Sequence, residues 1–262
     1  MKSNNTLSEN SIKTLLAGRL KDLPVYFYEE TDSTNTRAKE LITKDSFKSA
    51  LLVANSQTGG RGRVGHTFHS PKGTGIYMSL IFTPDSLENA THATTKAAVC
   101  VLEAVEELYG ISPQIKWVND LYLEGKKICG ILTEAVTAGP NKGSLVVGIG
   151  INFLKSPVPD DLKDIIGFLP SKSNVSREML IAKIITLLFK ELEALSDNSY
   201  IKKYRQASML TGNDITYFEN DIQKTATVLD IDDDAGLVVK LPDKSIKTLR
   251  NGEVFTLRKT TG

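Results

Sequence analysis

The chain has 262 residues, a length that allows one large domain or one large domain and a small one. Its 32 Lys and Arg residues are balanced by 31 Asp and Glu residues, so the formal net charge is only +1. This balance argues against bulk attraction to nucleic acid or to an anionic membrane, and an anionic ligand must be bound by a local cluster of cations.

Hydrophobic periodicity predicts alternating helices and strands over the first 209 residues. Apolar faces at helical spacing, with Ser8 and Ser176 as N-caps and Gly110 as a stop signal, mark the helices. In chain order the prediction is helix 8–20, strand 25–29, helix 34–42, strand 50–56, loop 57–68, strand 76–82, helix 89–108, strand 114–118, turn 119–125, strand 126–137, turn 138–143, strand 144–152, loop 160–173 and helix 177–195.

After residue 209 the pattern changes to short strands separated by turn signals. These strands are predicted at 215–219, 222–230, 237–241, 245–250 and 254–257. Five short strands in so few residues favour a small β-barrel. We therefore expect an α+β protein with two domains: a mixed central sheet flanked by helices over residues 1–209, and the barrel over residues 210–262.

Two features of the sequence bear on where the protein resides. The longest apolar runs, at 51–54 and 76–82, are far shorter than the ~20 residues that a membrane helix requires. Residues 1–10 are polar and lack the apolar core of a signal peptide, and the only cysteines are Cys100 and Cys129. We expect a cytoplasmic protein without a membrane partner.

The charge is unevenly distributed along the chain. Residues 46–84 contain no Asp or Glu, but they hold four Lys or Arg residues and six of the 19 glycines. Within this segment lies Gln57-Thr58-Gly59-Gly60-Arg61-Gly62-Arg63-Val64-Gly65, and Thr31-Asp32-Ser33-Thr34-Asn35 precedes it. Glycines let backbone amides approach a ligand, and two arginines at alternate positions can bind one anion, which predicts a phosphate or carboxylate site. A solvated surface loop is the alternative.

Two further motifs follow in the predicted strands. One is Lys116-Trp117-Val118-Asn119-Asp120, which continues through Lys126-Lys127-Ile128-Cys129-Gly130; the other is Gly148-Ile149-Gly150-Ile151-Asn152. The first is also compatible with a hairpin that has a solvated tip. The second is compatible with a structural bulge, or with a close approach of another group to a strand that lacks side chains. The occurrence of all three motifs together favours a functional site.

In this combination and order the motifs resemble those of the biotin protein ligases, with Ser70-Pro71 as a further match. The resemblance implies a catalytic domain with a mixed sheet of the class II synthetase kind, followed by a small SH3-like barrel. It also implies an enzyme that makes biotinyl-5′-adenylate from biotin and MgATP and then transfers biotin to a lysine of a biotin carboxyl carrier protein or carboxylase carrier domain.

Residue roles follow from the same resemblance. Arg63, Lys127 and Asp120 are the expected catalytic residues, with Asp120 as the base or orienting group for the acceptor lysine. The expected biotin-binding residues are Ser33, Thr34, Asn35, Gln57, Gly60, Arg61, Gly62, Arg63, Lys127 and Gly130. The expected ATP-binding residues are Arg61, Arg63, Asn119, Lys127, Ile151 and Asn152, and residues 165–170 correspond to the segment that covers adenine. Protein ligands for Mg²⁺ cannot be assigned from the sequence.

Two other functions are alternatives to biotin ligation. A lipoate ligase or octanoyltransferase shares the fold, but the Gly60–Gly65 string argues against it. A DNA-binding regulator is disfavoured by the neutral charge, and since only thirty residues precede Thr31, we expect neither a winged-helix domain nor a nucleic-acid partner. Members of the family often dimerise, so a homodimer is one expected assembly.

Overall fold

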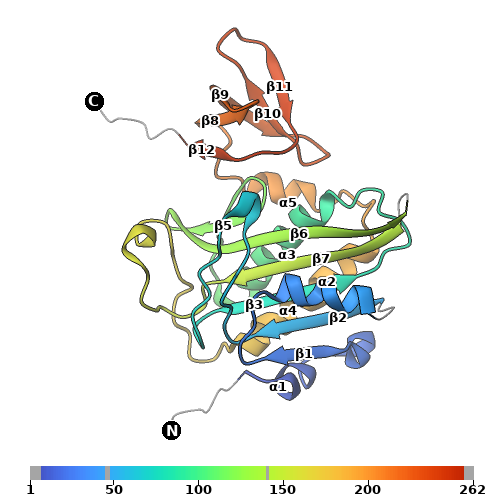
Figure 1. Ribbon diagram of the computed structural model, residues 1–262. Helices are drawn as coiled ribbons and strands as arrows, with labels where there is room; N and C mark the ends of the chain where they lie inside the picture. Colours follow the sequence, from blue (N-terminus) through green and yellow to red (C-terminus); the bar gives the residue numbers. More distant parts are fainter. Residues whose placement is uncertain (1–6, 45–47, 140–141, 257–262) are drawn as a thin grey trace.

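The protein is represented by a computed structural model that describes residues 7–44, 48–139 and 142–256 (Figure 1). Its centre is a seven-stranded sheet in the order β1-β2-β3-β7-β6-β5-β4. Only β1 and β2 are parallel, so the sheet is mixed, as expected from the sequence. The strands are β1 (Val25–Tyr28), β2 (Ser49–Ala54), β3 (Ile76–Phe82), β4 (Gln114–Lys116), β5 (Asp120–Leu123), β6 (Lys126–Gly139) and β7 (Lys142–Ile151).

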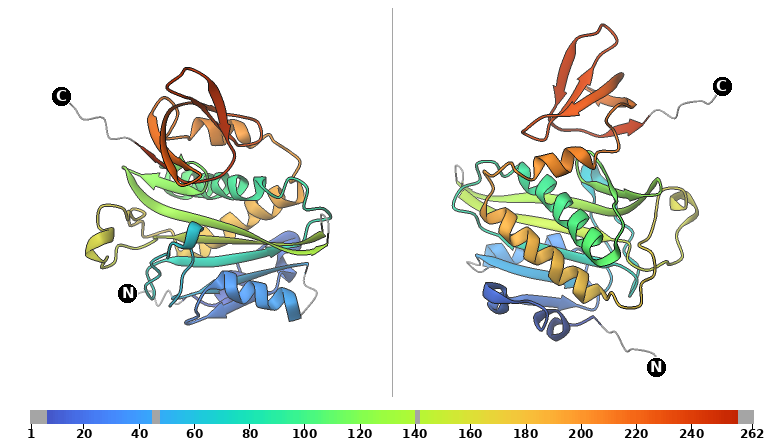
Figure 2. Two further views of the ribbon diagram at one scale, coloured as in Figure 1. Left: turned by 45° about the horizontal axis from the view of Figure 1, so that its top comes forward. Right: turned by 180° about the vertical axis from the view of Figure 1, so that it is seen from behind.

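Helices cover both faces of this sheet. The long helices α3 (His92–Tyr109) and α4 (Arg177–Glu193) lie side by side over one face, and α2 (Thr34–Lys44) lies on the other (Figures 1 and 2). Ser176 caps α4 through the amide of Met179, and Gly110 ends α3 in the left-handed conformation, both as predicted. Shorter elements are α1 (Glu9–Lys13), α5 (Ile201–Gln206) and the 3₁₀ helices Gly18–Asp22, Arg63–Gly65 and Asp160–Leu162.

Alternation along the central strands divides the apolar side chains between two cores. In β2, Leu51 and Val53 face α3 and α4, whereas Ala50 and Leu52 face α2. The same division separates Leu80 from Ile81 in β3. A strand buried on both faces reads as a nearly continuous apolar run, and Ser79 is the one break in the apolar run 76–82. The face that carries α2 is the face on which the candidate site lies.

A second sheet is formed by the C-terminal strands and is antiparallel throughout, in the order β11-β10-β9-β8-β12. The strands are β8 (Asp214–Glu219), β9 (Ile222–Ile231), β10 (Leu237–Lys240), β11 (Ile246–Leu249) and β12 (Val254–Thr256). Figure 1 shows this small sheet beside α5, at the β5 side of the large sheet. The two-part organisation matches the expected fold class, while the domain boundary after residue 209 stays a prediction.

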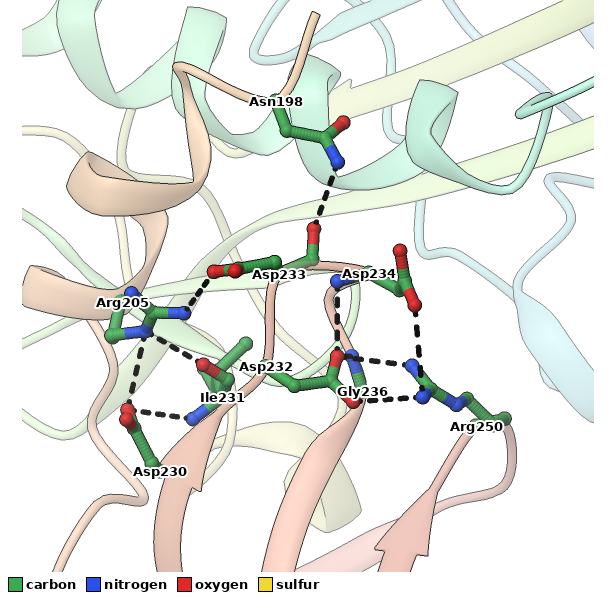
Figure 3. Close-up of polar contacts among 9 residues, drawn as sticks. All are labelled: Asn198, Arg205, Asp230, Ile231, Asp232, Asp233, Asp234, Gly236 and Arg250. Carbon is green, nitrogen blue, oxygen red and sulfur yellow. Dashed lines mark hydrogen bonds and ion pairs between the residues drawn. The ribbon is translucent and has the colours of Figure 1, made fainter. Parts of the chain in front are cut away.

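The small sheet is held to the large domain by the turn between β9 and β10 (Figure 3). Arg205 on α5 donates from Nε to the Ile231 carbonyl at 2.6 Å and pairs with the Asp233 carboxylate at 2.9 Å. Asn198 donates to the Asp233 carbonyl at 3.2 Å. The indole N–H of Trp117, the residue after β4, donates to the Ala235 carbonyl at 2.8 Å. The turn therefore connects the small sheet to the segment that carries Asn119 and Asp120.

Three sequence predictions differ from the structure. The helix expected at 8–20 is only Glu9–Lys13, because Gly18 takes a positive φ of 59° and a 3₁₀ helix follows. The turn expected at 119–125 contains strand β5, and the helix Ile201–Gln206 was not predicted. Residues 140–141 of the predicted turn 138–143, residue 257 of the last strand and residues 1–6 of the polar N-terminus lie outside the described residues.

No helix within the described ranges has the length and apolarity needed to cross a membrane.

The packing of α4 against the large sheet provides a test of the core. Leu188 is fully buried on the inner face of α4, and shortening it to alanine leaves a cavity. We expect Leu188→Ala to lower the free energy of unfolding by about 2 to 5 kcal/mol. Lys190→Ala, on the exposed face of the same helix, should change it by less than about 0.5 kcal/mol. Urea denaturation compares the two variants, and equal effects would contradict this account of the core.

Candidate functional site

The parallel pairing of β1 and β2 brings together the two parts of the first motif, residues 31–35 and the string that begins at Gln57. Both strands end at the same edge of the sheet, so residues 31–35 and Gln57 emerge side by side, joined by a bridge between Thr31 and Gln57. The Gln57 Oε1 atom accepts from the Thr34 amide at 2.8 Å and from its hydroxyl at 3.2 Å. That amide lies in the first turn of α2, where N–H groups have no partner within the helix. Gln57 therefore fixes the start of α2.

A row of residues crosses the large sheet on the α2 face. The strand register places Tyr77, Gly150, Gly130, Asp120 and Lys116 directly opposite one another on five adjacent strands. Residues directly opposite in an antiparallel pair point to the same face. The two glycines leave the centre of this row without side chains. The result is a trough with Tyr77 at one end and the charged residues Asp120 and Lys116 at the other.

Other groups occupy the space above the glycines. A Cβ atom at Gly150 would lie 2.6 Å from the Phe68 ring, and one at Gly130 would lie 3.1 Å from Lys127 Cε. In the adjacent row, a Cβ atom at Gly148 would lie 2.1 Å from Asn35 Oδ1. The glycines are therefore required by close approach, which was one of the explanations that their positions in the sequence left open.

A β-bulge turns Lys127 into the trough. Leu121 pairs with Cys129 but Tyr122 pairs with Lys127, so Ile128 is an extra residue on β6. Ile128 and Cys129 are both buried in the core beneath the sheet, although they are adjacent in the chain. An extra residue reverses the alternation of faces along a strand. Lys127 consequently shares the face of Gly130.

Lys127, Arg63 and Arg61 are cations in or beside the trough, and each of these three has a polar partner. Lys127 Nζ contacts Asp120 Oδ2 at 2.7 Å, and Arg63 donates to Asn119 Oδ1 at 3.2 Å. Asn119 in turn donates to Asp120 at 2.9 Å, so these groups form one network. Arg61 lies 3.5 Å from Glu134 Oε1. The predicted catalytic residues Arg63, Lys127 and Asp120 are thus brought together, although they come from three separate segments.

A second network positions Asn35. Its Nδ2 atom donates to Glu134 at 2.9 Å, and its Oδ1 atom lies 2.6 Å from the hydroxyl of buried Ser79. Burial disfavours the Glu134 carboxylate, but the hydrogen bonds from Asn35 and Lys39 outweigh this effect and hold the pKa of Glu134 below its usual value. Glu134 is therefore charged at neutral pH and anchors both Asn35 and Arg61.

These groups line one cavity of about 500 Å³, a volume typical of small-molecule sites. Most of the predicted site residues line it: Ser33, Thr34, Asn35, Gln57, Arg61, Gly62, Arg63, Asn119, Asp120, Lys127 and Gly130. Gly60, Ile151 and Asn152 do not. Gly60 packs behind Phe68, Ile151 is fully buried on the opposite face, and Asn152 donates to the Lys127 carbonyl at 3.0 Å.

The cavity also has walls that were not predicted to belong to the site. Lys116 and Tyr122 line it, as do residues 252–255 around the start of β12. His66 of the loop lies 3.4 Å from Glu253 of this segment. Period-2 reasoning can place Lys116 and Tyr122 on the face of Asp120 once β5 is recognised as a strand. No local signal in residues 252–255 connects them with the distant motifs.

Metal ligands were left unassigned in the sequence, and the structure adds none. Across residues 7–44, 48–139 and 142–256, no three His, Cys, Asp or Glu side chains gather closely enough to hold a metal ion. Cys100 and Cys129 are both buried, and burial raises the pKa of each thiol far above its usual range. A thiolate role in the site is therefore disfavoured.

Comparison with known proteins identifies relatives of this chain. Residues 27–152 match the model of the biotin/lipoate A/B protein ligase family. The bifunctional ligase/repressor BirA of Bacillus subtilis is 39% identical over 168 residues, which cover 63% of this chain and 52% of that protein. The biotin–[acetyl-CoA-carboxylase] ligase of Paracoccus denitrificans is 34% identical over 129 residues, which cover 48% of this chain and 53% of that protein. The chain thus spans about half the length of these two relatives.

The fold has solved counterparts. The biotin protein ligase of Aquifex aeolicus, in complex with biotin and ATP, superimposes with a TM-score of 0.76 at 27% identity. The match covers 90% of this chain and 99% of that one, so it includes both sheets.

The glycine row can be tested through stability. We expect Gly150→Ala to lower the free energy of unfolding by about 1 to 3 kcal/mol, because the new methyl group must displace the Phe68 ring. Gly59→Ala is the control, since its Cβ atom would meet nothing closer than 3.5 Å and its φ is not positive. That variant should stay within about 0.5 kcal/mol of the parent protein in urea denaturation. Equal stability of both variants would show that Phe68 does not require the glycine.

Proposed function

We propose that this chain, whose residues 27–152 match the model of the biotin/lipoate A/B protein ligase family, activates biotin with ATP and transfers it to a lysine of a biotin carboxyl carrier domain. The observation that carries the proposal is the juxtaposition of Arg63, Lys127 and Asp120 over a glycine floor, next to a neutral polar pocket. An uncharged ring and an anionic reaction centre need these two environments side by side.

The neutral end of the cavity suits the ureido ring of biotin. Ser33, Thr34, Asn35 and Gln57 line it with hydroxyl and amide groups, which can donate to the ring carbonyl and accept from its two N–H groups. The same groups are held by Ser79, Ser70 and the start of α2. A rigid neutral pocket of this kind binds an uncharged polar ring without leaving a buried charge unpaired.

The first step joins two anions. A carboxylate oxygen of biotin attacks the α-phosphorus of ATP, the bond from that phosphorus to the bridging oxygen breaks, and pyrophosphate leaves with the electron pair. Arg61, Arg63 and Lys127 offset the repulsion between the carboxylate and the phosphates and stabilise the charge that develops at phosphorus. Their partners Glu134, Asn119 and Asp120 hold these cations at the cavity.

The second step requires a neutral acceptor amine. The lysine of the carrier loses a proton, its nitrogen attacks the carbonyl carbon of the adenylate, and AMP leaves with the electron pair of the broken C–O bond. Asp120, which is in contact with Lys127 at 2.7 Å, is the carboxylate placed to accept that proton or to orient the amine. This assignment is part of the proposal.

The nucleotide is assigned to the side of Lys127 where residues 165–167 run. Lys127 exchanges two backbone hydrogen bonds with this segment, through Ile165 at 2.7 Å and Gly167 at 2.8 Å. Ile165 lines the cavity, and Asn152 holds the Lys127 carbonyl from beneath. Magnesium, when it arrives with ATP, neutralises phosphate charge and is held mainly by phosphate oxygens and water. Among the described residues, Asp120 and Glu253 are the carboxylates that line the cavity.

One assay tests the activity. Purified protein is incubated with ATP, Mg²⁺, radiolabelled biotin and a biotin carrier domain, and we expect label on the carrier lysine. Parallel reactions with labelled lipoate and octanoate should give none, because the motif string of residues 59–65 differs from that of the lipoate enzymes. Label from lipoate or octanoate in place of biotin would overturn the proposal.

The two steps can be separated by substitution. Lys127→Ala should slow biotin-dependent exchange between ATP and pyrophosphate by about a hundredfold or more, since it removes a charge from the developing transition state. Asp120→Asn should retain most of that exchange and lose transfer from preformed biotinyl-adenylate. Lys202→Ala, an exposed lysine on α5, is the control and should retain both steps. Loss of both steps in the Asp120 variant would place that residue in nucleotide binding instead.

A further inference from the structure

Lys116 is a cation of the cavity that has no role so far. It is the last residue of β4 and stands at the end of the cross-strand row, directly opposite Asp120. Its side chain lines the cavity and is half-buried. The ammonium group lies 5.7 Å from the centre of the Tyr122 ring and 5.5 Å from that of Phe255.

The surroundings of this ammonium group differ from those of the other cations. Arg61, Arg63 and Lys127 each have a polar partner, whereas Lys116 Nζ makes no ion pair or hydrogen bond with any of the described residues. Burial lowers the pKa of Lys116, the Asp120 charge raises it, and the Lys127 charge lowers it further. Asp120 and Glu253 are near enough to act on its charge, but neither forms an ion pair with it, so this half-buried cation faces the cavity without a directly bound counter-ion.

This inference rests on the proposed function: we propose that Lys116 binds the terminal phosphates of ATP and stabilises pyrophosphate as the leaving group. The position of Lys116 in the cavity supports this role. The cavity has a neutral end at Ser33 and Gln57, a nucleotide side at Ile165, and a third end walled by Lys116, Tyr122 and Phe255. Biotin and the nucleoside account for the first two, so the polyphosphate is assigned to the third.

The dimensions agree with this assignment. Lys127 lies above Gly130, and two strand spacings separate Gly130 from Lys116 along the row. Two spacings correspond to about 10 Å. A diphosphate and an extended lysine side chain together span such a distance. The α-phosphate beside Lys127 and the γ-phosphate beside Lys116 would then lie along one line across the sheet.

The movement of negative charge during the first step also supports a role for Lys116 at the terminal phosphates. When the bond between the α-phosphorus and the bridging oxygen breaks, that oxygen takes the electron pair and negative charge moves onto pyrophosphate. A cation at the far end is in place to receive this charge. The rings of Tyr122 and Phe255 both lie close to the ammonium group and reduce its contact with bulk solvent, which strengthens its interaction with phosphate.

The test compares Lys116→Met with the parent protein. Methionine keeps the apolar stem but removes the charge. We expect Lys116→Met to weaken the binding of pyrophosphate alone, measured by calorimetry, by about tenfold or more, and to raise the KM for ATP in biotin-dependent exchange similarly. Transfer from preformed biotinyl-adenylate should stay within about twofold of the parent, because the adenylate has lost the terminal phosphates.

Two control variants complete the experiment. Lys116→Arg should recover most of the pyrophosphate binding, and Lys202→Met removes an equal charge from an exposed position on α5 and should change nothing. Unchanged pyrophosphate binding in Lys116→Met would overturn the inference, as would an equal loss in transfer from preformed adenylate. If the parent protein shows no biotin-dependent exchange, the proposed function fails, and pyrophosphate binding still decides the role of Lys116.

Discussion

The site depends on one packing constraint: three glycines on adjacent strands leave room for side chains that cross the face of the sheet. Gly130 and Gly150 lie beneath Lys127 and Phe68, and Gly148 lies beneath Asn35. A methyl group at any of them would push a neighbouring side chain away: the Phe68 ring at Gly150, the Asn35 amide at Gly148 and the Lys127 side chain at Gly130. The charged network around Lys127, the neutral pocket and the Phe68 ring all lie over these glycines. This part of the sheet is rigid because both of its faces are packed.

The chain is nearly neutral overall, yet it gathers cations at one site. This is possible because each of three site cations has a polar or acidic partner beside it. Glu134, Asn119 and Asp120 hold Arg61, Arg63 and Lys127 in place through direct contacts. An anionic ligand therefore exchanges one set of partners for another, and the cations do not have to be immobilised when it binds. Pre-organised groups of this kind lose little side-chain entropy on binding.

Much of the fold could be predicted from the sequence, because long apolar runs and capping residues mark β3, α3 and α4 directly. The three motifs also pointed to a functional site because they occur together in one chain, whereas the parallel pairing that joins residues 31–35 to Gln57 is visible only in the structure. The sequence did not indicate β5, whose four residues lie among turn formers, or the extra residue Ile128 that turns Lys127 toward the cavity. Residues 252–255 join the site only through the docking of the second sheet, a tertiary effect without a local signal.

The docking of the small sheet has a thermodynamic consequence. Its β9–β10 turn is fixed by Arg205, Asn198 and Trp117, and its residues 252–255 form a wall of the cavity. A ligand that touches both sheets binds only while they remain docked, so its binding free energy adds to the cost of local opening of the C-terminal strands. Amide hydrogen exchange in β8 and β12 would then slow as the cavity fills, although neither strand carries any of the sequence motifs.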